Sequence, residues 1–366
     1  MNKGIRSGTR RNSRSVIENG LNADGFAYVP AEDDPESIRQ FLKGFRPPTS
    51  RHKPVGAMLS RTYVGYPTPV IFTTQTSNFG TTIISSVAFG NSLWVAGGDT
   101  GQLRTSTDAV TWTTQTSNFG TTIILSVAYG NNLWVAGGAF GQIRTSTDAV
   151  TWTTRTSNFG NTAIQSIAYG NNLWVAVEGS GQLRTSTDGT TWTTRTSNFG
   201  TTAIRAVAYG NNLWVAGGNT GQIRTSTDAV TWTTRTSNFG TTSIMSVAYG
   251  NSLWVAGGFS GQIRTSTDAI TWTTRTSNFG TTTIREIAYG NSLWVAGGEA
   301  GQIRTSTDAV TWTTRTSNFD TTSIVSVAFG NNLWVAGGYF GKLRTSKNTL
   351  YDRGYSFSAT TGYILQ

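Results

Sequence analysis

The stretch "GNSLWVAGGDTGQLRTSTDAVTW", residues 90–112, decides the fold because it returns at a fixed interval. Its copies begin 40 residues apart, at Gly90, Gly130, Gly170, Gly210, Gly250, Gly290 and Gly330. A fixed period of this length is typical of repeat architectures, in which each unit buries its apolar face against its neighbours. The repeat therefore sets the organisation of this chain of 366 residues.

One period contains four short strands. Residues 83–89 have the alternating pattern of a strand and are followed by the pair Gly90-Asn91. This pair predicts a tight hairpin into an apolar second strand at 93–97. A glycine-rich turn leads to a third strand at 102–106, and "STDAV" leads to a fourth at 111–116. The segments are rich in Thr, Val, Ile and Trp and show no helical period. The sequence predicts an all-β fold, a seven-bladed β-propeller of four-stranded repeats.

The tryptophans predict how the ring closes. The second strands hold Trp94, Trp134, Trp174, Trp214, Trp254, Trp294 and Trp334, and the fourth strands hold Trp112, Trp152, Trp192, Trp232, Trp272 and Trp312. A fourteenth tryptophan is missing because the period reaches Asp352, whereas the position 40 residues before Trp112 is Phe72. We therefore predict that residues 69–76 form the closing strand of a propeller that spans 69–352.

The segment "STDAVTW" resembles the Asp-box of sialidase-like (BNR-like) propellers, S-x-D-x-G-x-T-W, although it is one residue shorter. The resemblance implies a propeller in which the aspartate ties the turn together. These aspartates are Asp108, Asp148, Asp188, Asp228, Asp268 and Asp308. The near-identity of the copies also resembles propellers of bacteriophage tails and fibres. Asp-boxes occur in enzymes, assembly factors and binding proteins, so the resemblance implies a fold and no particular reaction.

The composition argues against catalysis. The chain has no cysteine, and its one histidine, His52, lies in the segment "RPPTSRHKP". A thiol nucleophile, a histidine triad and a histidine-rich metal site are therefore not expected. The acidic residues outside the Asp-box turns form no recognisable catalytic pair. We predict a protein that is not an enzyme and has no cofactor and no metal site, and the alternative is a sialidase-like propeller that binds or hydrolyses glycans.

The copies differ mainly in two places, the residue pair between strands two and three and the start of strand one. Because propeller strands alternate in direction, both places lie on one face. The candidate binding face comprises Asp99, Thr100, Ala139, Phe140, Gln165, Glu178, Ser180, Arg205, Asn219, Thr220, Met245, Phe259, Ser260, Arg285, Glu299, Ala300, Tyr339 and Phe340. Variation on one face of a constant scaffold favours a recognition surface, and the alternative is relaxed change at tolerant loop tips.

Two series of arginines repeat with the blades. The third strands carry Arg104, Arg144, Arg184, Arg224, Arg264, Arg304 and Arg344, and the fourth strands carry Arg155, Arg195, Arg235, Arg275 and Arg315. We expect each member of the first series to pair with a nearby Asp-box carboxylate or to cap a turn. The alternative is a basic ring that reads phosphate or sulfate. The second series is expected to form a solvated rim.

The ends of the chain differ from the repeats. Residues 1–68 hold 11 Lys or Arg and 6 Asp or Glu. They begin with a basic block, typical of a docking arm, that carries Lys3, Arg6, Arg10, Arg11 and Arg14. A short helix is predicted at 33–45, with Pro35 in its first turn. Residues 353–366 are expected to be a tail. No run is apolar and long enough to predict membrane insertion.

Together these patterns predict a non-enzymatic binding or structural propeller of a virion, such as a phage tail, fibre or decoration protein. Its expected partners are other virion or assembly proteins through residues 1–68, and a host-surface glycan or protein at the variable face. Nucleic acid is not an expected partner, because the tryptophans belong to the repeat core. The alternative is a cytoplasmic assembly factor, like the propellers that chaperone photosystem assembly.

Overall fold

The structure, a computed structural model, describes residues 26–27, 58–66, 70–347 and 352–360. The chain forms two compact units, Met1–Pro69 with Thr349–Gln366, and Val70–Asn348. The described part of the first unit is a three-stranded antiparallel sheet in the order β1 (Phe26–Ala27), β31 (Asp352–Thr360) and β2 (Met58–Tyr66). Much of the segment expected as a tail therefore pairs, as β31, with chain that precedes the repeats. The predicted helix at 33–45 and the five basic residues of the arm lie outside the described residues.

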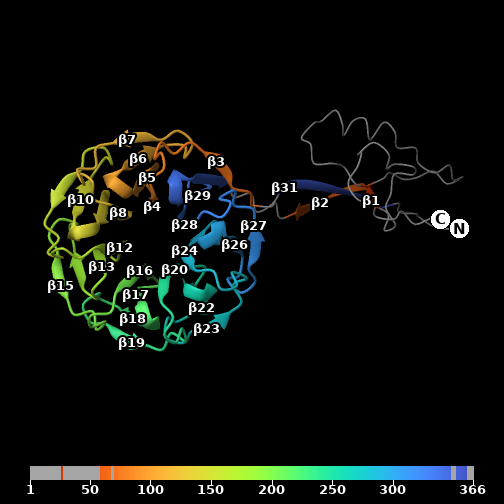
Figure 1. Ribbon diagram of the computed structural model, residues 1–366. Helices are drawn as coiled ribbons and strands as arrows, with labels where there is room; N and C mark the ends of the chain where they lie inside the picture. Colours follow the sequence, from red (N-terminus) through yellow and green to blue (C-terminus); the bar gives the residue numbers. More distant parts are fainter. Residues whose placement is uncertain (1–25, 28–57, 67–69, 348–351, 361–366) are drawn as a thin grey trace, which may run out of the picture. The chain divides into compact units, whose positions relative to one another are not determined.

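The second unit is a ring of seven four-stranded antiparallel sheets (Figure 1), so the prediction of a seven-bladed all-β propeller is confirmed. The first blade consists of β4 (Ile84–Gly90), β5 (Leu93–Gly98), β6 (Leu103–Ser106) and β7 (Thr113–Gln115). The second and third blades are β8 (Ile124–Gly130), β9 (Leu133–Gly138), β10 (Ile143–Ser146) and β11 (Thr153–Arg155), then β12 (Ile164–Gly170), β13 (Leu173–Glu178), β14 (Leu183–Ser186) and β15 (Thr193–Arg195).

The remaining blades repeat this order. The fourth and fifth are β16 (Ile204–Gly210), β17 (Leu213–Gly218), β18 (Ile223–Ser226) and β19 (Thr233–Arg235), then β20 (Ile244–Gly250), β21 (Leu253–Gly258), β22 (Ile263–Ser266) and β23 (Thr273–Arg275). The sixth and seventh are β24 (Ile284–Gly290), β25 (Leu293–Gly298), β26 (Ile303–Ser306) and β27 (Thr313–Arg315), then β28 (Ile324–Gly330), β29 (Leu333–Gly338), β30 (Leu343–Lys347) and β3 (Thr73–Gln75). The first strand of each blade contacts the first strands of both neighbours, so these strands form the inner ring.

The ring closes with chain from before the first repeat. β3 pairs antiparallel with β30, and Thr73 lies opposite Thr345. Phe72 is fully buried, and its carbonyl accepts a hydrogen bond from Asn318 Nδ2 at 2.6 Å. The equivalent bond in the first blade joins Asn78 Nδ2 to the carbonyl of Trp112. Residue 72 thus takes the place of the missing tryptophan.

The core lies between neighbouring blades. Trp94 and Trp112 of the first blade pack with Val335 and Leu343 of the seventh, and the same cluster recurs around the ring. Trp112 lies one residue before its strand, and its Nε1 donates to the carbonyl of Ala109 at 3.1 Å, so it belongs to the turn rather than to β7. Each large aromatic buries about 150–250 Å², which stabilises the fold by about 4–6 kcal/mol as an upper bound.

The first hairpin of each blade explains the Gly-Asn pair. Asn91 and Ser92 have φ of 47° and 59°, the left-handed values of a tight two-residue turn. A Cβ on Gly90 would lie 2.3 Å from the ring of Tyr129 in the next blade. The glycine is therefore required by the close approach of that ring, which in turn packs on Trp134 with centroids 4.8 Å apart.

Candidate functional site

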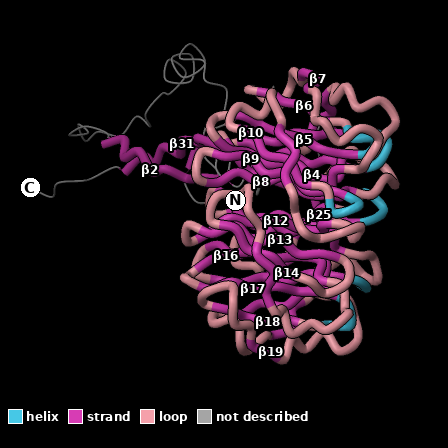
Figure 2. Tube along the Cα trace, turned by 90° about the vertical axis from the view of Figure 1, so that its left-hand side faces the viewer, coloured by secondary structure: helices cyan, strands magenta, loops and turns pink. Residues whose placement is uncertain are grey.

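The turn between the second and third strands is a short 3-10 helix in six blades. These helices are η1 (Asp99–Gly101), η2 (Ala139–Gly141), η3 (Asn219–Gly221), η4 (Phe259–Gly261), η5 (Glu299–Gly301) and η6 (Tyr339–Gly341). The backbone N–H of Asp99 donates to the carbonyl of Ile83 at 3.0 Å, so the variable pair lies beside the start of strand one. Both variable places therefore lie together, and Figure 2 shows the short helices (cyan) on one side of the propeller. We call this side the variable face.

The second residue of each short helix has a left-handed backbone. Thr100 and Phe140 have φ of 54° and 53°, and the same holds for Thr220, Ser260, Ala300 and Phe340. Elsewhere in the repeat such positions hold Asn, Gly or Ser, for example Asn78, Gly101 and Ser92, and in the aspartate turns they hold Ala, for example Ala109. The variable pair thus includes a strained position that glycine does not occupy.

Most predicted members of the binding face are accessible. Phe140 and Phe340 are each 64% exposed and Phe259 is 43% exposed, although aromatic side chains are usually buried. Thr100, Thr220, Ser260 and Ala300 are also exposed. The members that are partly exposed are Asp99, Ala139, Gln165, Ser180, Arg205, Asn219, Met245, Arg285, Glu299 and Tyr339.

Glu178 is the exception, because it is fully buried and presents no surface. Its carboxylate accepts hydrogen bonds from Ser180 N at 3.0 Å, Ser180 Oγ at 2.8 Å and Gln182 N at 2.6 Å. Glu178 stands where the first blade has Gly98. A Cβ added to Gly98 would lie 1.9 Å from the carbonyl oxygen of Ile83. The third blade has no 3-10 helix at this turn: Gly179 N keeps the bond to the carbonyl of Ala163, but Gln182 N donates to the Glu178 carboxylate, whereas Gln102 N in the first blade donates to the carbonyl of Asp99. Glu178 therefore caps its own turn.

The start of strand one contains a β-bulge. The register shifts between Ile84 and Ser86, so residue 85 is the extra residue. The bulge residues of the seven blades are Ser85, Leu125, Gln165, Arg205, Met245, Arg285 and Val325. The next residue joins neighbouring blades, since Ser86 Oγ accepts a hydrogen bond from Val127 N at 3.0 Å. Ala206 and Glu286 replace this serine in the fourth and sixth blades.

Charged groups at the bulge are concentrated in the fourth and sixth blades. Arg205 donates from Nε to Asn219 Oδ1 at 3.0 Å and from Nη1 to Gln165 Oε1 at 3.3 Å. Arg285 forms an ion pair with Glu299. Burial lowers the pKa of Arg205, and the positive charge of Arg285 lowers it further.

Glu286 follows the sixth bulge residue and is partly buried. Its Oε1 accepts a hydrogen bond from Ser246 Oγ at 3.0 Å. Burial raises the pKa of Glu286 to about 7, against the lowering effect of its bonds to Ser246 and Ile287. At neutral pH this carboxyl is therefore only partly ionised.

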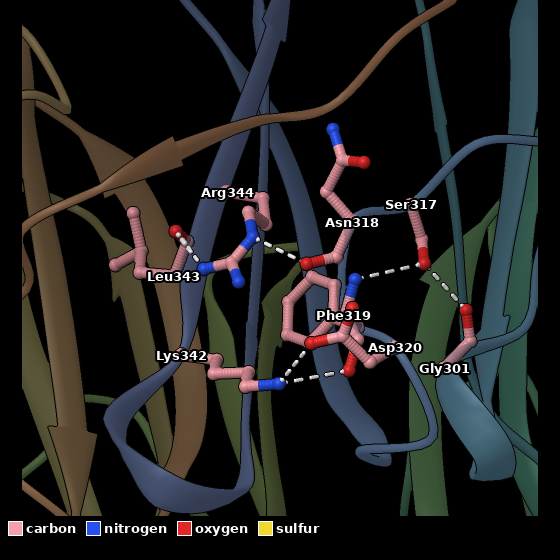
Figure 3. A network of polar contacts seen from close by, with 8 residues as sticks. All are labelled: Gly301, Ser317, Asn318, Phe319, Asp320, Lys342, Leu343 and Arg344. Carbon is pink, nitrogen blue, oxygen red and sulfur yellow. Dashed lines mark hydrogen bonds and ion pairs between the residues drawn. The ribbon is translucent and has the colours of Figure 1, made fainter.

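The arginines of the third strands cap backbone carbonyls. Arg344 donates from Nε to the carbonyl of Asn318 at 2.9 Å and from Nη1 to that of Leu343 at 3.0 Å (Figure 3). Its guanidinium lies over the ring of Phe319, 5.0 Å from the centroid. The expected turn-capping role is confirmed, but the expected pairing with the Asp-box carboxylates is wrong, because those carboxylates bind their own turns. Burial lowers the pKa of Arg344, as it does in the other six blades.

The opposite face carries the aspartate turns, residues 106–111 and their equivalents. Asp108 Oδ1 accepts hydrogen bonds from Ser106 Oγ, Val110 N and Thr111 N at 2.8–2.9 Å. These bonds, Thr111 N first, lower the pKa of Asp108. The predicted role of this aspartate as a turn device is confirmed. Sequence reasoning missed that the turns expose apolar side chains at 41–49%, namely Val110, Val150, Val230, Ile270 and Val310. Their repetition next to a turn aspartate was the available signal.

Other features offer little chemistry. Arg155 donates from Nε to Thr145 Oγ1 at 2.8 Å and is partly exposed, consistent with a rim, and Gln115 makes the same bond in the first blade. A hollow of about 390 Å³ between the second and third blades is lined by Thr154, Arg155, Thr156, Asn158, Thr190, Thr191 and Trp192. Within the described ranges, no group of three or more His, Cys, Asp or Glu could hold a metal ion, and no helix could cross a membrane.

Comparisons with known proteins show the fold. No family model matches the sequence, and no curated protein matches it. YCF48 from Cyanidioschyzon merolae is 15% identical, with a TM-score of 0.61 over 76% of this chain and 98% of that one. The structure of YCF48 bound to D1 peptide is 15% identical, with a TM-score of 0.63 over 76% of this chain and 95% of that one. Virginiamycin B lyase from Staphylococcus aureus is 10% identical, with a TM-score of 0.69 over 76% of this chain and 99% of that one. At these identities the likeness extends to architecture alone.

Proposed function

We propose that the protein is a non-catalytic recognition propeller whose variable face binds a partner protein. One observation carries the proposal: the copies keep their core and their aspartate turns, and they differ where the short 3-10 helices meet the β-bulges. These two places share a hydrogen bond from Asp99 N to the Ile83 carbonyl and lie on one side of the ring. A rigid disc with exposed aromatic and polar side chains on one side suits a protein interface.

The left-handed position is a further feature of the variable pair. A Thr or Phe with φ near 54° costs free energy that Gly or Asn would avoid. Asn holds such positions at Asn78 and Asn91, but Ala109 in the constant aspartate turn is also left-handed, so strained backbone occurs on both faces. The proposal therefore rests on the concentration of the differences between copies on one face and on the exposed aromatic side chains there.

Three carboxylates near the variable face have partners within the fold, which supports a non-catalytic role. Glu178 caps its turn, Glu299 pairs with Arg285, and Asp320 pairs with Lys342 at 2.8 Å. Acid–base catalysis needs a positioned carboxylate that is free to exchange a proton with a substrate. The fold is compatible with other roles, since one structural neighbour is a lyase and another holds a peptide. The proposal therefore depends on the face of this chain and on no neighbour.

The setting that we propose is a virion, with the basic residues between Lys3 and Arg14 as the docking arm. Its support is the resemblance of near-identical copies to phage tail and fibre propellers, together with five positive charges and no acid in the first 14 residues. Mass spectrometry of purified particles tests this setting. Recovery of the protein only from host cytoplasm would favour a cellular assembly factor.

A pair of matched variants tests the recognition role. In the first, the turn pair of every blade with a 3-10 helix is changed to Asn-Thr, the natural pair at 219–220. In the second, the exposed apolar residues of five aspartate turns become Thr, as at Thr190, so the second variant changes five residues on the opposite face and the first changes nine on the variable face. Both variants keep residue types that the repeat already accepts. We expect both to melt within about 2 °C of the wild type.

The measurement is quantitative capture of binding proteins from the particle or host extract on each immobilised variant. The proposal expects that the proteins retained by the wild type are lost on the first variant and kept on the second. Equal retention on all three would contradict a recognition role for the variable face. Turnover of a sialoside or another glycoside that is lost in the first variant would contradict the non-catalytic role.

A further inference from the structure

One sector of the variable face places an apolar patch between two cations. Arg205 and Arg285 are the bulge residues of the fourth and sixth blades, and Met245 is that of the fifth. The inner strands β16, β20 and β24 contact one another in this order. Phe259 N donates to the carbonyl of Ser243, so the backbone of this exposed residue lies at the start of β20, beside the segment that carries Met245. The order around the ring is therefore cation, apolar patch, cation.

Arg205 is held in place by neutral groups. Its partners, the side-chain oxygens of Asn219 and Gln165, orient the guanidinium without cancelling its charge. Among the described residues no carboxylate forms an ion pair with it, and Nη2 has no hydrogen-bond partner. Both neutral partners are specific to their copies. A fixed guanidinium with free donors is suited to a carboxylate, which can accept two of its hydrogen bonds.

The second cation adds to the positive potential. Arg285 is partly paired with Glu299, but its Nε is buried without a partner. Burial lowers the pKa of Arg205, and the charge of Arg285 lowers it further. Glu286 offers little compensation, because burial raises its pKa to about 7 and it bonds to Ser246. Both arginines are partly shielded from solvent, so the potential of the pair is screened less than that of a free surface charge.

We infer that this sector binds an acidic segment of the partner protein, with carboxylates on Arg205 and Arg285 and an apolar side chain between them on Met245 and Phe259. The inference rests on the proposed function and specifies its ligand. A sulfated or phosphorylated polyanion would satisfy the arginines, but it would leave the apolar patch uncovered. A peptide with acidic residues on both sides of apolar ones complements all three parts of the sector.

The test uses a fluorescein-labelled peptide of eight residues, with two glutamates on each side of a Leu-Leu pair, and fluorescence anisotropy. A peptide with Gln in place of Glu is the ligand control. R205Q and R285Q remove one charge each, and Gln is the natural bulge residue at Gln165. R275Q removes a charge from the rim, where Gln75 and Gln115 occupy the equivalent position and keep the hydrogen bond to a threonine.

The inference expects R205Q and R285Q each to weaken binding of the Glu peptide about tenfold, and the Gln peptide to bind at least about tenfold more weakly. M245S, which introduces the residue found at Ser85, is expected to weaken binding about threefold to tenfold. R275Q is expected to change the affinity by less than about twofold. Unchanged melting temperatures show that each variant is folded.

Three outcomes would overturn the inference. An equal loss in R275Q and R205Q would mean that net charge alone attracts the peptide. Tight binding of a heparin hexasaccharide that R205Q abolishes and M245S leaves intact, without binding of the Glu peptide, would assign the sector to a sulfated glycan. No binding of the peptide by the wild type, while the Asn-Thr variant still loses its captured partner, would overturn this inference and leave the proposed function standing.

Discussion

The turns on the two faces of the propeller connect the same strands but satisfy their backbone groups in opposite ways. In the aspartate turns, side chains satisfy the backbone: Asp108 accepts the N–H groups of Val110 and Thr111. In the 3-10 turns the backbone satisfies itself, since Gly98 N donates to the Gln102 carbonyl and Gln102 N to that of Asp99. A turn that depends on its side chains must keep them. A turn held by its backbone leaves its side chains available for other contacts.

Removal of the closing strand has the largest expected effect, because both faces depend on a closed ring. Deletion of residues 69–76 removes β3 and the buried Phe72 from the seventh blade. We expect aggregation or loss of cooperative unfolding in calorimetry. Deletion of residues 1–25, which spares β3, is the control. A cooperative transition at an unchanged temperature in the first deletion would show that the ring does not need this strand.

A single aspartate turn is expected to have an intermediate effect. Asp228 accepts hydrogen bonds from Val230 N, Thr231 N and Ser226 Oγ, and Thr231 N first among them lowers its pKa. Because the aspartate is largely exposed, we expect Asp228→Ala to lower the free energy of unfolding by about 1 kcal/mol. The lowered pKa means that this contribution is present above pH 4 and is lost as the pH falls through the folded-state value. Chemical denaturation at pH 7 and at pH 3 checks both points, and a larger loss at pH 3 would contradict the second.

Glu286 is expected to have an effect of similar size with the opposite sign. Its folded-state pKa of about 7 lies above the ordinary value of 4.5, so the folded protein holds the proton more tightly. The free energy of unfolding therefore falls as the pH rises from about 4.5 to 7. We expect Glu286→Ser, the residue in five other copies, to stabilise the fold by about 1 kcal/mol at pH 8, after allowance for partial exposure, and to have little effect at pH 4. Stabilisation that is equal at both pH values would show that the charge is not its cause.

Exchange of a variable residue is expected to have the smallest effect on stability. Phe140 is 64% exposed and its turn is closed by backbone bonds, so Phe140→Thr should change the free energy of unfolding by less than about 0.5 kcal/mol. Thermal unfolding followed by tryptophan fluorescence measures this change. A loss above 1 kcal/mol would mean that the ring packs on the propeller and that the two faces do not differ in the way described above.

The architecture was predictable because the same pattern of strands and turns occurs seven times in the sequence. The period, the alternation and the count of tryptophans lead to the blades and to Phe72 as the closing aromatic. The role of Asp108 was also predictable, since a turn aspartate acts within a few residues. The burial of Glu178 was not predictable, because its position in the repeat indicates exposure. In the structure Gln182 N donates to its carboxylate and the turn forms no 3-10 helix, a change that cannot be read from the pattern.

The partners of the arginines could not be predicted for a related reason. Arg104 lies near Asp108 in sequence, which suggested an ion pair. In the structure Arg104 instead donates to the carbonyl of Asn78 at 2.8 Å, from the connection that enters the same blade. Likewise, Arg205 and Gln165 lie 40 residues apart and meet because bulges of neighbouring blades converge. Sequence reasoning identifies such residues as variable, but the pairing requires the three-dimensional ring.

The closing strand β3 pairs with the last repeat in the same way as a fourth strand pairs within its own blade. β3 meets β30 through Thr73, Thr74 and Gln75, opposite Thr345, Arg344 and Leu343. Within the first blade the same residue types meet in the same register, from Thr113 opposite Thr105 to Gln115 opposite Leu103. Unequal recombination between near-identical gene segments would add or delete whole units of 40 codons. Each product would still offer β3 a matching last strand, so the number of repeats and the order of the variable turns would change without any change in the closing strand.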